Sequence, residues 1–97
     1  MKFRQVKKDE FFVIELEEDP NSGYKWSLEP NDFFEIQKIE RMIQRNKSYE
    51  DLTKRNMVLV FHIKSKQIGE STIRMFLRRP WEPKNHVSLY EENIKVE

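Results

Sequence analysis

The sequence predicts an all-β fold, an antiparallel β-sandwich made of two sheets. Apolar and polar residues alternate with a period of two in most segments, which is typical of strands with one buried face. Clusters of turn-forming residues separate these segments. The composition, 37% hydrophobic and 36% charged, provides enough apolar material for one core and enough charge to cover it. The 97 residues are therefore expected to form a single domain over residues 1–97.

The predicted strands follow one another along the whole chain. In the first, Phe12, Ile14 and Leu16 share one face, while Glu15 and Glu17 lie on the other. The alternating segments are FFVIELE at 11–17, YKWSLE at 24–29, MVLVFHIK at 57–64, STIRMFLRR at 71–79 and NIKVE at 93–97. Turn signals occupy 7–10, 19–23, 29–32, 66–70 and 79–85. This order of short strands and turns favours a sandwich.

One segment, FFEIQKIERMIQ at 33–44, fits two structures. Ile36, Ile39 and Ile43 recur at helical spacing, which would suit a short helix. Phe34 and Ile36 also fit a strand, and a bulge could restore the alternation further on. We favour a strand over residues 33–43 because every neighbouring segment is β. The polar stretch 44–56 is expected to be a long loop.

Composition excludes several classes of partner. Eighteen basic and 17 acidic residues are interleaved and give a net charge of +1, so we expect no nucleic-acid partner. The absence of cysteine excludes disulfides and thiolate chemistry. No apolar run has the length of a membrane span or a signal peptide. The expectation is a cytoplasmic protein, unless an export signal preceded the printed sequence.

The sequence offers no constellation for catalysis. His62 falls on the outer face of a predicted strand and His86 follows a Pro-rich turn, with no metal-ligand spacing between them. The two glycines of the chain cannot form a phosphate-binding loop. The neighbouring carboxylates in Glu17–Glu18 and in Glu91–Glu92 point to opposite faces of a strand. We therefore expect no enzyme activity, no metal and no cofactor.

The stretch DPNSGYKW at 19–26 concentrates turn-forming residues directly before two large aromatics. Pro20 presets φ, Gly23 permits φ > 0, and Asp19, Asn21 and Ser22 can each bond the local backbone. It could be a plain hairpin turn or a shaped loop that another molecule recognises. Likewise, the tryptophan of RPWEP at 79–83 could be a packed corner or an exposed contact residue.

Together these two stretches identify a family. DPNSGYKW resembles the NPTTGYxW-type motif of the chagasin-like inhibitors of papain-family cysteine peptidases, and LRRPWEP resembles the RPW motif of that family. The resemblance covers roughly residues 6–97. It implies an immunoglobulin-like β-sandwich with three loops at one end, which form a wedge that enters the active-site cleft of the peptidase.

The resemblance also implies which residues contact the peptidase. The first loop, which would block the catalytic centre, contains Asp19, Pro20, Asn21, Ser22 and Gly23, with Tyr24 at its base. The third loop begins with Arg79, Pro80 and Trp81. Asp19 stands where the family usually has Asn, and both residue types form Asx-turns. Inhibition would be reversible and competitive, and the partner a papain-like cysteine peptidase, with a monomer as the default state.

The middle loop departs from the family pattern. The family normally carries a glycine-rich GxGG-type motif there, whereas this chain reads DLTKRNMVLVF. The residues that take its place are Leu52, Thr53, Lys54, Arg55 and Asn56. The missing glycines favour an alternative function, a non-inhibitory immunoglobulin-like module that binds protein or carbohydrate.

Overall fold

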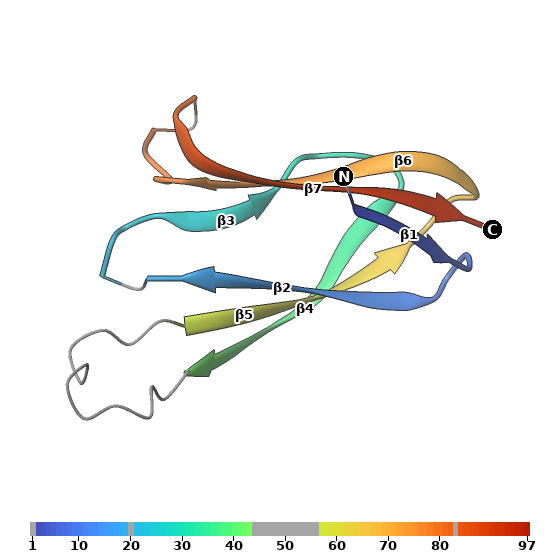
Figure 1. Cartoon of the computed structure of the whole chain (residues 1–97), viewed down its shortest axis with the longest axis horizontal. Helices are drawn as coiled ribbons and strands as arrows, with labels where there is room; N and C mark the ends of the chain where they lie inside the picture. The colour runs from blue at the N-terminus through green and yellow to red at the C-terminus, as the bar shows by residue number, and fades with distance from the viewer. Residues whose placement is uncertain (1, 20, 44–56, 83) are drawn as a thin grey trace.

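The computed structural model describes residues 2–19, 21–43, 57–82 and 84–97, which form two β-sheets packed face to face (Figure 1). Within these ranges every regular element is a strand. The strands are β1 (Lys2–Val6), β2 (Phe11–Glu18), β3 (Lys25–Leu28), β4 (Phe34–Ile43), β5 (Met57–Ser65), β6 (Gly69–Arg78) and β7 (His86–Val96). One sheet has the order β1-β7-β6-β3 and the other has the order β2-β5-β4. The predicted β-sandwich is confirmed.

The first and last strands differ from the expectation. β1 was not predicted, because its sequence KFRQV shows no alternation of apolar and polar residues. In the structure only Val6 of this strand is buried. β7 begins at His86, well before the expected start at residue 93. β1 pairs with β7 in parallel, with Lys2 opposite Glu92 and Val6 opposite Val96. All other pairings are antiparallel, so both sheets are antiparallel apart from this one edge.

The segment with two possible structures is a strand, and its helical spacing comes from a β-bulge. The register of β4 against β5 shifts between Ile36 and Lys38. The extra residue, Gln37, lets Ile36 and Ile39 lie on the same face although they are three positions apart. They lie opposite the buried Ile63 and Phe61 of β5.

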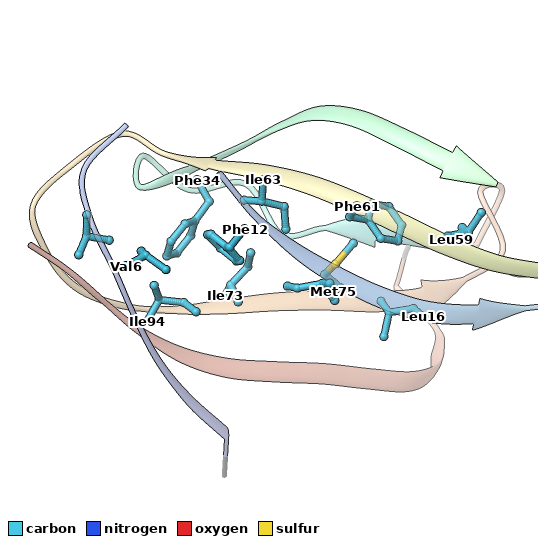
Figure 2. Close-up of a cluster of buried hydrophobic side chains, with 12 residues drawn as sticks. Val6, Phe12, Leu16, Phe34, Leu59, Phe61, Ile63, Ile73, Met75 and Ile94 are labelled. Atoms are coloured by element: carbon cyan, nitrogen blue, oxygen red, sulfur yellow. The ribbon is translucent and has the colours of Figure 1, made fainter. Parts of the chain in front are cut away.

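The core lies between the sheets and draws side chains from both (Figure 2). Its buried members are Val6, Phe12, Ile14, Leu16, Phe34, Leu59, Phe61, Ile63, Ile73, Met75, Ile94 and Val96. Phe12 and Phe34 meet edge to face, with ring centroids 5.9 Å apart. Burial of each large side chain stabilises the fold by about 1.5–3 kcal/mol, and truncation of Ile73 to alanine would cost about 2–5 kcal/mol.

Strand register brings three chain segments to one end of the sandwich. Met57 lies opposite both Glu18 and Ile43, so the ends of β2 and β4 meet the start of β5. Arg78 lies opposite both Lys25 and His86 in the other sheet. The strands β2, β4 and β6 therefore terminate at the same end of the sandwich (Figure 1). Leu52–Asn56, the expected middle contact, lie outside the described residues.

Candidate functional site

The connection from β2 to β3, the first loop, is held by hydrogen bonds among its own residues. The backbone N–H of Asn21 donates to Oδ1 of Asp19 at 2.9 Å, which is an Asx-turn. The Ser22 hydroxyl donates to the carbonyl oxygen of Asp19 at 2.8 Å and accepts from the Tyr24 N–H at 3.1 Å. The short side chains thus satisfy the backbone of a tight turn, as expected for Asp19 and Ser22. Pro20 lies outside the described residues.

Gly23 ends the first loop in a conformation that favours glycine. Its φ of +79° lies in the left-handed region, which a residue with a Cβ adopts only at a cost. The indole of Trp81 lies directly over it, because a Cβ built on residue 23 would be 3.2 Å from Cη2 of Trp81. The glycine therefore serves both the turn and the close approach of the third loop.

Two hydrogen bonds, both donated by Trp26, join the strands at the base of the first loop. The backbone N–H of Trp26 donates to the Glu18 carboxylate at 3.2 Å, and the Trp26 indole Nε1–H donates to the Glu17 carbonyl at 2.8 Å. Since β2 and β3 belong to different sheets, no ladder hydrogen bonds join them here. These two bonds, which we call the Glu18–Trp26 clamp, fix where the loop leaves the sandwich.

The third loop, residues 79–85, begins with a turn stabilised at Arg79. The Glu82 N–H donates to the Arg79 carbonyl at 2.9 Å, and the Arg79 guanidinium lies 3.8 Å from the Glu82 carboxylate. The same guanidinium lies over the Tyr24 ring, 4.7 Å from its centroid, and 6.0 Å from that of Trp81. Arg79 thus links the third loop to the base of the first.

The structure brings most of the predicted contact residues together. Gly23 meets Trp81 and Tyr24 meets Arg79, so the two loops form one body. We call residues 19, 21–24 and 79–82 the loop cluster. Trp81 remains 67% exposed, so it is a surface residue and not a packed corner.

Glu18 is a site residue that the sequence analysis did not single out. It is 8% exposed and supplies the carboxylate of the clamp. The alternation in FFVIELEE would have found it, since the buried face of Phe12, Ile14 and Leu16 continues to Glu18. A carboxylate on a buried face needs a hydrogen-bond donor, and the Trp26 N–H provides one.

Away from the loop cluster, His62 and Glu40 form a polar pair on the outer face of one sheet. His62 lies on the outer face of β5, with Nε2 3.0 Å from a carboxylate oxygen of Glu40. The pKa of Glu40 is lowered, first by its hydrogen bond and charge interaction with Lys38 and then by His62. Within the described ranges, no group of three His, Cys, Asp or Glu side chains could hold a metal ion. The same ranges contain no helix with the length and apolarity needed to cross a membrane.

Together the strands form a β-sandwich in which the first and third loops contact each other at one end. The sequence model of the chagasin family peptidase inhibitors (I42) matches residues 5–96. The chain belongs to this family, and it is accordingly an inhibitor and not an enzyme.

Several solved structures share this fold. The cysteine protease inhibitor EhICP2 from Entamoeba histolytica superposes with a TM-score of 0.78 at 18% identity, over 99% of this chain and 87% of that one. Amebosin gives a TM-score of 0.67 at 18% identity over 100% and 99% of the two chains. PbICP-C, solved in complex with falcipain-2, gives 0.64 at 18% identity over 98% and 86%. No curated protein matched the sequence.

Proposed function

We propose that this protein inhibits papain-like cysteine peptidases by inserting the loop cluster into the active-site cleft. Membership of the chagasin family supports inhibition over the alternative of a non-inhibitory binding module. The solved structures of similar fold include a cysteine protease inhibitor and a complex of PbICP-C with falcipain-2. The observation that carries the proposal is the direct contact of the first and third loops, which makes one rigid projection from two distant parts of the chain.

Rigidity in the free protein favours binding. Ordering a loop on association costs about 0.5–1.5 kcal/mol for each immobilised side chain, and a loop that is already ordered avoids this cost. The first loop is held by the hydrogen bonds of Asp19 and Ser22, and its base by the Glu18–Trp26 clamp. The short side chains of Asn21 and Ser22 allow a close approach of the loop backbone to a narrow cleft.

Trp81 and Arg79 provide the side chains that suit a protein interface. Trp81 exposes a large, flat, amphipathic ring, a type enriched among residues that dominate binding energy. Arg79 holds that ring and Tyr24 in place through its guanidinium. A protease–inhibitor interface of ordinary size buries about 1,600 Å² in total, more than the loop cluster alone is expected to supply. Because β4 terminates at the same end of the sandwich, Leu52–Asn56, which follow it in the sequence, are proposed to contribute the remaining contact.

Titration of papain and a cathepsin L-like peptidase with the purified protein tests the proposal. We expect stoichiometric loss of activity that is overcome by raising the substrate concentration and reversed by dilution, because no covalent step is involved. A serine peptidase such as trypsin serves as the control and should remain active. Full activity of every papain-like enzyme at micromolar inhibitor would refute the proposed function. Residence in the cytoplasm stays a prediction.

A further inference from the structure

The third loop connects β6 to β7, so its direction depends on how both of its ends are held. The first end is held by Arg79, whose guanidinium lies over the Tyr24 ring of the first loop. Two consecutive turns then join this end to the second one: the Glu82 N–H donates to the Arg79 carbonyl at 2.9 Å, and the Asn85 N–H donates to the Glu82 carbonyl at 3.2 Å. Trp81 lies inside the first of these turns, so a shift of the second end of the loop also moves its indole.

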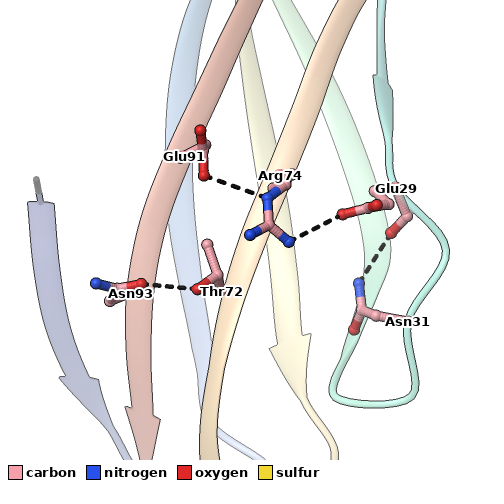
Figure 3. Close-up of polar contacts among 6 residues, drawn as sticks. All are labelled: Glu29, Asn31, Thr72, Arg74, Glu91 and Asn93. Atoms are coloured by element: carbon pink, nitrogen blue, oxygen red, sulfur yellow. Dashed lines mark hydrogen bonds and ion pairs between the residues drawn. The ribbon is translucent and has the colours of Figure 1, made fainter.

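On the outer face of the sheet, β6 and β7 are joined by side-chain pairs that follow the strand register. The Thr72 hydroxyl donates to Oδ1 of the opposite Asn93 at 2.7 Å, and Arg74 lies 3.2 Å from the carboxylate of the opposite Glu91 (Figure 3). Phe76 is the next outward residue of β6, two positions closer to the third loop. A regular antiparallel ladder would continue this order of directly opposite pairs up to the loop.

A β-bulge interrupts the ladder at the base of the third loop. Leu77 lies opposite Ser88, but the next residue, Arg78, lies opposite His86, so Val87 is an extra residue on β7. In a regular strand His86 and Ser88 would point to the same face of the sheet. The extra residue changes this alternation, and bulges of this kind also increase the local twist and redirect the neighbouring side chain.

The redirected side chain is that of His86, which lies against the outward ring of Phe76. The two ring centroids are 5.1 Å apart and the ring planes are tilted by 56°, a separation within the range of about 4.5–7 Å that is typical of paired rings. Phe76 directly follows Met75, which is fully buried, so its ring is a firm support for His86. The bulge and the ring contact together fix the second end of the third loop on β6.

We propose that His86 is a positioning residue for the loop cluster. Its contact with Phe76 fixes the second end of the third loop, and this holds the Trp81 indole over Gly23. In this role His86 acts through Trp81 and needs no contact with the peptidase. The effect on inhibition rests on the proposed function, whereas the contact between Trp81 and Gly23 can be measured in the free protein.

Truncation of the His86 ring tests this inference. His86→Ala removes the contact with Phe76, and the variant should fold because His86 is exposed. His86→Phe keeps an aromatic ring, and Val87→Ala is the matched control, since it shortens the other exposed side chain of the same bulge. Nuclear Overhauser effects between the Trp81 ring and the Gly23 Hα protons are measured in the free protein, and inhibition constants are measured against papain-like peptidases.

We expect His86→Ala to weaken the Overhauser effect between Trp81 and Gly23. It should also raise the inhibition constant by about threefold to tenfold, while His86→Phe and Val87→Ala stay within about twofold of the wild type. In a Trp81→Ala background the loss of the His86 ring should change the inhibition constant by less than about twofold, because a residue that acts through Trp81 then has nothing to position.

Two results would overturn the inference. One is an unchanged Overhauser effect in His86→Ala, and the other is an equal loss of inhibition with and without the Trp81 indole, since His86 would then act by itself. If the wild type inhibits no papain-like peptidase, the proposed function fails, and the Overhauser measurements in the free protein still decide the role of His86.

Discussion

The indole of Trp81 rests on Gly23, with only 3.2 Å between its Cη2 atom and the place a Cβ of residue 23 would occupy. The two residues belong to different loops and lie far apart in sequence. Their contact, together with that of Arg79 and Tyr24, gives the loop cluster a defined shape in the free protein. Substitutions at these residues distinguish the contacts that serve inhibition from those that serve folding.

Gly23→Ala should weaken both stability and inhibition. The left-handed φ costs a residue with a Cβ about 1–3 kcal/mol, and the new methyl group would push the Trp81 ring away. Gly69→Ala is a matched control, because Gly69 also has a positive φ and its Cβ would lie 3.2 Å from the Phe33 ring, at the opposite end. Thermal unfolding and inhibition titrations should show that both variants lose stability and that only Gly23→Ala inhibits poorly. Equal inhibition by the two variants would contradict the role of the Gly23–Trp81 contact.

Trp81→Ala should weaken inhibition by about 1–4 kcal/mol while changing the unfolding free energy by less than about 1 kcal/mol. The reason is that Trp81 is 67% exposed and contributes little to the core. Ile68→Ala provides the comparison, since Ile68 is 69% exposed in the turn at the other end. A large drop in melting temperature for Trp81→Ala, with inhibition retained by the folded fraction, would make Trp81 a structural residue.

Glu18→Ala should release the base of the first loop. The Trp26 N–H would lose its acceptor, at a cost of about 1–3 kcal/mol, and the inhibition constant should rise. Glu18→Gln keeps an acceptor oxygen, so its stability and its inhibition constant should both lie close to those of the wild type. Urea unfolding and inhibition assays are run in parallel on the two variants. Normal inhibition by a destabilised Glu18→Ala would mean that the clamp supports the fold alone.

Because the pKa of Tyr90 is raised in the folded protein, we expect the protein to lose stability at alkaline pH. Burial, and then the hydrogen bond from its hydroxyl to the Glu92 carboxylate at 2.8 Å, raise the pKa of Tyr90 to about 12 from 10.0. Between these two pH values the unfolded chain has released the phenol proton and the folded chain retains it, so the free energy of unfolding falls as pH rises. Below pH 10 the contribution is fully present. Urea unfolding of Tyr90→Phe should show a shallower decline over this range, and parallel curves for the two proteins would exclude the effect.

The sequence predicts the central strands well, because each carries a local signal. Alternation of apolar and polar residues predicts β2, β5 and β6. In β4 the bulge at Gln37 explains why Ile36 and Ile39 stand three positions apart, a spacing that also suits a helix. β1 carries no such signal, since its place depends on pairing with β7 at the other end of the chain. A partner so distant in sequence leaves no periodic pattern in a segment of five residues.

In the candidate site, too, the features set by neighbouring residues could be predicted and those set by distant residues could not. The turn chemistry of Asp19, Ser22 and Gly23 is local and could be predicted from residue types. The contact of Arg79 with Tyr24 could not, because it depends on how the two sheets place their loops. Glu18 is an intermediate case: its burial follows from the alternation in β2, but its hydrogen-bond partner lies across the loop, in the other sheet.

The course of β7 has a practical consequence for presenting the protein on a surface. The strand runs from the third loop at His86 to Val96, roughly 35 Å of extended chain, so the carboxyl end emerges on the side remote from the loop cluster (Figure 1). A bead, dye or carrier domain joined after Glu97 would stand clear of a bound peptidase. Immobilised by that end, the molecule should capture its target with the loops pointing outward.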